Sequence, residues 1–146
     1  MVYRRACIPA TGESWFISAN VDWIGSTTGM TLNGGVAVYT ANSTGTPLAK
    51  LVFDGIQYQW IHRDGAGSTS GNLASPTPAT NDTIGILVTR ATTTTWDFSF
   101  VINGTTALAH TGHTYDPLTE TEALWGMNVN QNSTINGMLF DRFDIA

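Results

Sequence analysis

Two carboxylates, Glu120 and Glu122, stand two positions apart, so on an extended chain both side chains point to the same side. Glycosidases use such a pair, with the two carboxyl groups about 5–9.5 Å apart across the scissile bond. This pair lies in a polar approach to a strand, where acidic groups are ordinarily solvated. Asp141 and Asp144 are three positions apart and face opposite sides of a strand. We therefore predict no catalytic residue, and we expect Asp141 to accept hydrogen bonds from a neighbouring loop.

A covalent nucleophile is equally hard to find. The sequence has no Gly-x-Ser-x-Gly elbow, and its single cysteine, Cys7, has no sequence cue that pairs it with a histidine. The same count excludes an intrachain disulfide and a zinc site built from cysteines. We expect Cys7 to be a structural or merely exposed thiol.

Metal ligands are sparse and poorly spaced. His110 and His113 bring two imidazoles together, with Asp116 nearby, but the spacing matches no known zinc motif. We therefore predict no metal site and no cofactor. Calcium stays open as an alternative, because lectin-like sandwiches hold it with acid, amide and backbone oxygens. Its candidate ligands here are Asp64, Asn72 and Asp82.

Aromatic and amide side chains are the best candidates for binding. Sugar rings present C–H faces that stack on Trp and Tyr, while their hydroxyls need amides or carboxylates. The predicted ligand-binding residues are Tyr58, Trp60, His62, Trp125, Asn128 and Asn130. Core packing is the competing interpretation for Tyr58, Trp60 and Trp125, since each shares a strand face with apolar neighbours. The opposite, polar faces, with Gln57 and Gln59 or with Asn128 and Asn130, either line a groove or meet water.

The elements that must position these residues are strands. Alternation of apolar and polar residues predicts about nine of them, and no segment has helical periodicity. They are expected at 14–24, 35–40, 49–54, 56–63, 83–91, 96–103, 105–110, 123–130 and 134–145. Asp54-Gly55 and Asn103-Gly104 are hairpin-turn sequences. Residues 64–82 are expected to form a surface loop, and 111–122 a looser stretch. Trp23, Trp96 and the alternating Phe98, Phe100 and Ile102 are expected in the core.

Composition and charge narrow the function. The chain is 42% hydrophobic and 12% charged, with five Trp, and its net charge is −5. The acidic balance argues against nucleic acid as a partner, because phosphate binding needs clustered cations. No apolar run is long enough to span a membrane, and no polybasic patch would bind one. Residues 1–9 lack the apolar segment of a secretory signal peptide, so we expect synthesis in the cytoplasm.

Three stretches resemble a known superfamily. Ile86 to Arg90 followed by Trp96 to Thr105 is similar to the central hairpin of concanavalin A-like, laminin G-like jelly rolls, which ends in "NG". Asn136 to Ile145 resembles their closing strand, with Asp141 at the family's aspartate, and Ser14 to Trp23 resembles an early strand. The resemblance implies an all-β fold of two antiparallel sheets packed as a jelly-roll sandwich. The domain it resembles is of the kind found in phage virion proteins.

We expect a single domain over residues 1–146, with 1–13 a short N-terminal arm or edge strand. Most such domains have more chain before the early strand, so a sheet edge is expected to be open to strand addition by a partner or a second copy.

Our functional prediction is a non-enzymatic protein of a bacteriophage virion, either a capsid decoration or a fibre module. Its expected partners are other virion proteins or copies of itself, together with host glycans. The alternative is a carbohydrate-binding module or lectin. A glycoside hydrolase or lyase that uses Glu120 and Glu122 is a third reading.

Overall fold

The structure is a computed structural model of the 146-residue chain. It describes residues 2–24, 32–40, 47–54, 56–65, 67–79, 81–115, 122–131 and 137–145. Side chains are described within 8–21, 34–39, 47–54, 56–65, 67–79 and 81–115. Trp23 and Cys7 fall outside this second set, so their predicted environments do as well.

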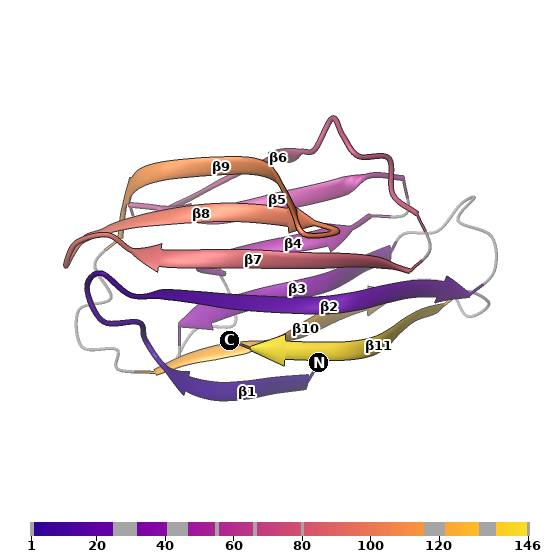
Figure 1. The fold of residues 1–146 in the computed structure, drawn as a ribbon, viewed down its shortest axis with the longest axis horizontal. Coiled ribbons are helices and arrows are strands. Elements are labelled where there is room, and N and C mark those ends of the chain that lie inside the picture. The colour runs from indigo at the N-terminus through magenta and orange to yellow at the C-terminus, as the bar shows by residue number, and fades with distance from the viewer. Residues whose placement is uncertain are drawn as a thin grey trace.

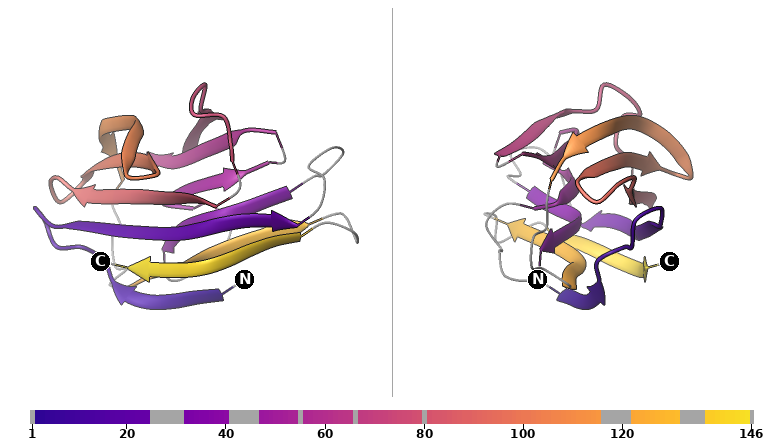
Figure 2. Two further views of the ribbon diagram at one scale, coloured as in Figure 1. Left: turned by 45° about the vertical axis from the view of Figure 1, so that its right-hand side comes forward. Right: turned by 90° about the vertical axis from the view of Figure 1, so that its left-hand side faces the viewer.

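Two antiparallel sheets face each other (Figure 1). The first contains, in order, β1 (Val2–Cys7), β10 (Glu122–Gln131), β3 (Leu32–Thr40), β4 (Ala49–Phe53), β5 (Tyr58–Asp64) and β6 (Gly67–Asn72). The second contains β11 (Gly137–Ile145), β2 (Ser14–Ile24), β7 (Asp82–Arg90), β8 (Thr95–Ile102) and β9 (Thr105–Thr114). Figure 2 shows the two layers from other sides. The predicted all-β sandwich is confirmed. Among the described residues, no helix has the length and apolar character to cross a membrane.

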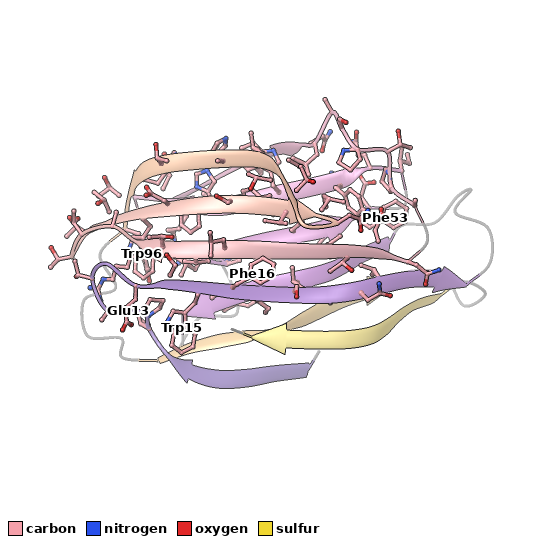
Figure 3. All side chains as sticks on the ribbon, in the orientation of Figure 1. Glu13, Trp15, Phe16, Phe53 and Trp96 are labelled. Carbon is pink, nitrogen blue, oxygen red and sulfur yellow. The ribbon has the colours of Figure 1, made fainter. Side chains whose placement is uncertain are left out.

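The core lies between the sheets and follows the alternation in the sequence. In β8 every second residue is buried, and Trp96, Phe98 and Phe100 are fully enclosed, as predicted. Apolar side chains of β3, β4 and β5 meet them from the other sheet. Trp96 and Phe53 mark opposite ends of this core in Figure 3. Burying these faces against each other is the main force that holds the two layers together.

The hairpin between β8 and β9 turns as its sequence predicts. Asn103 and Gly104 both have positive φ, 50° and 77°. Two successive left-handed residues make a type I′ turn, whose twist matches that of the flanking strands. The Asn103 side chain also accepts a hydrogen bond from the backbone N–H of Thr83 (2.8 Å), which joins the turn to β7.

Two strands differ from the prediction. β6 lies inside the segment 64–82 that was expected to be a loop, and β9 continues to Thr114 instead of ending near 110. β6 reads Gly-Ser-Thr-Ser-Gly-Asn and is mostly exposed, so it has no apolar face for a pattern to reveal. β9 is irregular, with two breaks in its pairing with β8.

The N-terminal residues form an edge. β1 pairs antiparallel with β10 from Val2 opposite Met127 to Cys7 opposite Glu122, and no second neighbour of β1 is found among the described strands. The N-terminal arm therefore adds one strand to the larger sheet, next to a strand from near the C-terminus (Figure 1).

Candidate functional site

The larger sheet has an outer face, turned away from the core, that carries most of the polar side chains of β4, β5 and β6. Leu51, Tyr58 and Trp60 belong to the core, so their strand neighbours project to the other side. We use "outer face" for the described residues on that side: Ala37, Tyr39, Lys50, Val52, Gln59, Ile61, Arg63, Ser68, Ser70 and Asn72.

Strand register arranges these residues in rows across the sheet. Asn72 lies opposite Gln59, which lies opposite Val52. The next row runs from Ser70 through Ile61 to Lys50. Directly opposed residues on one face are close neighbours, about 4.5–5.5 Å apart at Cβ. The rows therefore place a lysine, amides and hydroxyls on one face. Its members Ala37, Tyr39 and Val52 are buried, so β5, β6 and Lys50 carry the accessible part.

The charge of this face differs from that of the chain. Its described side chains include two cations, Lys50 and Arg63, and no carboxylate, whereas the whole chain has 11 acidic and 6 basic residues. Lys50 is half-buried, and this burial lowers the pKa of its ammonium group. Arg63 lies over the ring of Tyr115 (5.0 Å to the centroid), which orients the guanidinium.

A small groove of about 110 Å³ follows the β5–β6 pair. It is lined by Gln59, Trp60, Ile61, Ser70, Gly71 and Asn72. Gly71 is required there, because a Cβ would lie 2.8 Å from the indole Cζ2 of Trp60. The groove therefore offers amide and hydroxyl groups beside Ile61, the mixture that a sugar ring needs. Gln59 was singled out in the sequence as part of a polar face, and the structure puts it in this groove.

A second cluster of chemical groups lies between the sheets, where β5 approaches β9. His62 is on the inner face of β5 and is fully buried. His110 and His113 come from β9, opposite Phe98 and Trp96 of β8. Residues three apart on a regular strand face opposite ways, but β9 bulges between them, with Gly112 at φ 71°. The bulge turns both imidazoles toward the core side.

The three rings are in contact. The Nε2 atom of His62 lies 2.7 Å from Nδ1 of His110, and the His62 and His113 ring centroids are 4.1 Å apart. Nδ1 of His62 lies 2.9 Å from the carbonyl oxygen of Arg63, and Nδ1 of His113 lies 3.4 Å from Oδ2 of Asp64. We call His62, His110 and His113 the histidine cluster.

Aromatic neighbours enclose this cluster. His62 stacks between Trp60 (5.5 Å) and Phe98 (4.9 Å), and His110 meets Trp60 edge to face at 4.5 Å. Burial lowers the pKa of His62, and the nearby imidazoles lower it further. Burial and His113 also lower the pKa of His110. The lowered pKa values favour the neutral form of His62 and His110.

The other predicted binding residues on β5 belong to the core. Tyr58 is fully buried, and its hydroxyl donates to Oδ2 of Asp82 at 2.5 Å. Trp60 is 9% exposed and covers Gly71. Ile56, which alternation over 56–63 predicts on the same face, precedes β5 and is 80% exposed. Because Tyr58 and Trp60 point into the core, their strand neighbours Gln59 and Ile61 project from the outer face.

Three further predicted binding residues, Trp125, Asn128 and Asn130, lie on β10, and their side chains are outside the described set. The register puts Asn128 opposite Gly35 and Asn130 opposite Asn33 of β3. Gly35 in turn pairs with Val52, so Asn128 occupies the same row of the sheet as Gln59.

The acidic residues considered as catalytic or metal-binding candidates lie in different parts of the fold. Glu120 and Asp116 lie outside the described residues, and Glu122 begins β10 opposite Cys7. On β11, Asp144 pairs with Ser18, and Asp141 falls at a break in the register. Of the calcium candidates, Asp64 faces His113 and Asn72 ends β6, while Asp82 is only 5% exposed. Asp82 accepts hydrogen bonds from Tyr58, from the Ala79 N–H and from Asn103, which makes it a structural centre.

Comparison with protein-family models finds no match, and neither does comparison with curated proteins. Solved structures do match. Alginate lyase AlyC3 in complex with dimannuronate superposes with a TM-score of 0.61 at 11% identity, over 91% of this chain and 63% of that chain. Alginate lyase A1-II′ superposes with a TM-score of 0.57 at 12% identity, over 97% of this chain and 64% of that chain. A human galectin-16 variant gives 0.54 at 15%, over 96% of each chain. The chain thus spans less than two thirds of the lyases' length, and it shares their concanavalin A-like fold.

These structures correct our functional prediction. The fold is shared with alginate lyases and galectins, and no virion protein is among the matches described above. The prediction of a non-enzymatic bacteriophage virion protein is therefore wrong, and the carbohydrate-binding alternative is better supported. The prediction that the chain is not an enzyme is contradicted as well, because the lyases are enzymes. Since identities of 11–15% establish the fold alone, activity must be argued from the site.

Proposed function

We propose that the protein binds an acidic polysaccharide on the outer face of its larger sheet. The observation that carries this proposal is the charge of that face: two cations and no carboxylate among its described side chains, in a chain of net charge −5. A neutral glycan needs no such segregation. A uronate chain, with one carboxylate per sugar, does, because an acidic surface would repel it.

The groups on the face suit such a ligand. Lys50 and Arg63 carry the positive charge that pairs with carboxylates, and the Arg63 guanidinium lies over the ring of Tyr115. Gln59, Ser70 and Asn72 supply hydrogen bonds to hydroxyls along the groove. Ile61 lies between these polar groups and contacts the C–H face of a ring. Support from outside the chain comes from the fold, which an alginate lyase in complex with dimannuronate shares.

A second candidate function, lysis of the same polysaccharide, is favoured by Lys50. An elimination removes the proton beside the uronate carboxylate, forms a C=C bond and breaks the C–O bond, with a proton passing to the leaving oxygen. Its base must be neutral near the working pH, and burial shifts the pKa of Lys50 in that direction. Arg63 then neutralises the carboxylate whose neighbouring carbon loses the proton.

Calorimetric titration with mannuronate oligosaccharides and with a neutral mannan tests the binding proposal. We expect binding of the acidic ligand alone, and a loss of at least about tenfold for Lys50→Met and for Arg63→Met, since charge-assisted hydrogen bonds contribute about 1.5–3 kcal/mol each. Arg90→Met is the matched control: it removes a cation from the other sheet and leaves affinity unchanged. Equal affinity for both glycans, or no binding of either, contradicts the proposal.

Ultraviolet absorbance of the new double bond separates the two functions. If the protein is a lyase, absorbance rises with time, and Lys50→Met and Lys50→Arg both abolish the rise while Lys50→Arg retains binding. Tight binding with no absorbance change assigns the face to binding and rules out lysis of that polymer.

A further inference from the structure

We infer that the histidine cluster is a binding site for one divalent transition-metal ion, with Zn²⁺ the best match. One ligand nitrogen from each of His62, His110 and His113 can be chosen so that all three lie within 4.8 Å of one another. Around tetrahedral zinc, with Zn–N of about 2.0–2.1 Å, the nitrogens stand roughly 3.3 Å apart. Small rotations of the imidazoles on β9 close the difference.

At His62 and His113, a hydrogen bond and an ion-pair contact favour the tautomers that a metal needs. We assign the Nδ1 proton of His62 to the bond with the Arg63 carbonyl (2.9 Å), which leaves a lone pair on Nε2. The His113 Nδ1 faces the Asp64 carboxylate at 3.4 Å, which leaves its Nε2 free in the same way. A metal-ligating histidine almost always donates its second ring N–H to a carbonyl or carboxylate, and this cluster has one of each.

The contact between His62 and His110 shows where the ion would enter. Nε2 of His62 accepts the Nδ1 proton of His110 at 2.7 Å, so two ring nitrogens converge on one proton. A metal ion takes the place of this proton. The displaced proton moves through solvent to Nε2 of His110, so both rings stay neutral and the proton count does not change.

Donor type decides which ion is bound. Three imidazoles favour Zn²⁺, Ni²⁺ or Cu²⁺ over Ca²⁺ and Mg²⁺, which prefer oxygen ligands. Three protein ligands leave the fourth position of a zinc ion for water. His110 and His113 are half-buried, so this position is reached from solvent.

The surroundings hold the rings in place. Trp60 and Phe98 sandwich His62, and Trp60 meets the edge of His110, so His62 is fixed on its strand before any ion arrives. The three ligands of the proposed site come from both sheets, since His62 is on β5 and the other two histidines are on β9. An ion at this position would therefore cross-link the two layers.

The test uses the full chain without a polyhistidine tag, stripped with a chelator and titrated with Zn²⁺, Co²⁺ and Ca²⁺. We expect one Zn²⁺ per chain, a visible absorption band of tetrahedral Co²⁺, and no heat from Ca²⁺. At a hundredfold excess of Zn²⁺ over its Kd the melting temperature should rise by about 5–10 °C. A wild-type chain with neither heat nor a cobalt band overturns the inference, whatever any variant does.

Variants then assign the ligands. His110→Gln and His113→Gln should each weaken Zn²⁺ binding at least tenfold and remove the cobalt band, whereas Thr111→Ala, an exposed neighbour on β9, should change neither. If His113→Gln binds Zn²⁺ as Thr111→Ala does, His113 is not a ligand and the three-histidine site is wrong.

Discussion

At the scale of single residues, Tyr58 shows how a polar group is accommodated in this core. Its hydroxyl, on β5 of the larger sheet, donates to Asp82, which begins β7 of the smaller one. Asp82 also accepts from the N–H of Ala79 and from the amide of Asn103 in the β8–β9 turn. One buried carboxylate therefore ties two sheets and a turn together, and its charge is satisfied by three donors.

Tyr58→Phe should lower the free energy of unfolding at pH 7 by about 1.5–3 kcal/mol, because the lost hydrogen bond is to a charged group. Burial, and then the bond to Asp82, raise the pKa of Tyr58. The folded chain thus keeps this proton at a pH where the unfolded chain loses it, above about 10. Wild-type stability falls with rising pH there, and the gap to Tyr58→Phe narrows. Urea unfolding at pH 7, 9 and 10.5 measures this; a gap independent of pH contradicts it.

At the scale of elements, the bulge in β9 determines which side chains of this edge strand point toward the core. Gly112 has a φ of 71°, and its N–H donates to the Asp97 carboxylate (2.8 Å) on β8. An added Cβ would meet nothing within 4 Å, so the requirement for glycine is one of backbone conformation and not of space. The bulge lets two histidines three residues apart share one face.

Substitution at Gly112 separates conformation from packing. Gly112→Val should lower the free energy of unfolding by about 1–2 kcal/mol, since a β-branched residue resists the left-handed region. Gly112→Asn, the matched control, should cost clearly less, because Asn adopts that region readily. Chemical denaturation compares the two. Equal losses would show that the side chain's size, and not φ, sets the cost.

The sequence predicts the regular elements well and the irregular ones poorly. Alternation in residues 56–63 puts Tyr58, Trp60 and His62 on one face and Gln59 and Ile61 on the other, as the structure has them. The six polar or glycine residues of β6 have no such alternation of apolar groups, and hydrogen bonds to β5 alone define that strand.

The sites were predictable only in part, for a related reason. His110 and His113 were paired in the sequence analysis, but the third imidazole comes from 48 residues before His110 and from the opposite sheet. That contact depends on how the layers stack and on a bulge, neither of which periodicity encodes. The positive charge of the outer face was missed because Lys50 and Arg63 are on different strands. Only the register of β4 and β5 places them near each other.

At the scale of the whole molecule, both sites depend on one shared core. The outer face exists because Leu51, Tyr58 and Trp60 turn inward, and the histidine cluster lies beside Phe98 and Trp60. Binding on one face and metal binding between the layers should therefore be lost together when the core melts. A chain of this length with a single continuous core is expected to unfold in one step.

Phe100→Ala tests this cooperativity. Phe100 is fully buried on β8 and lies 5.9 Å from the Trp60 ring across the sandwich, so the cavity left by truncation touches both sheets. We expect a loss of about 3–5 kcal/mol. Far-ultraviolet circular dichroism follows the strands and tryptophan fluorescence follows the packing, and both midpoints should move by the same amount. Separate fluorescence and dichroism transitions, in wild type or variant, would contradict this expectation. They would mean that one sheet keeps its strands after the other has lost its packing, so that the two layers are not a single folding unit.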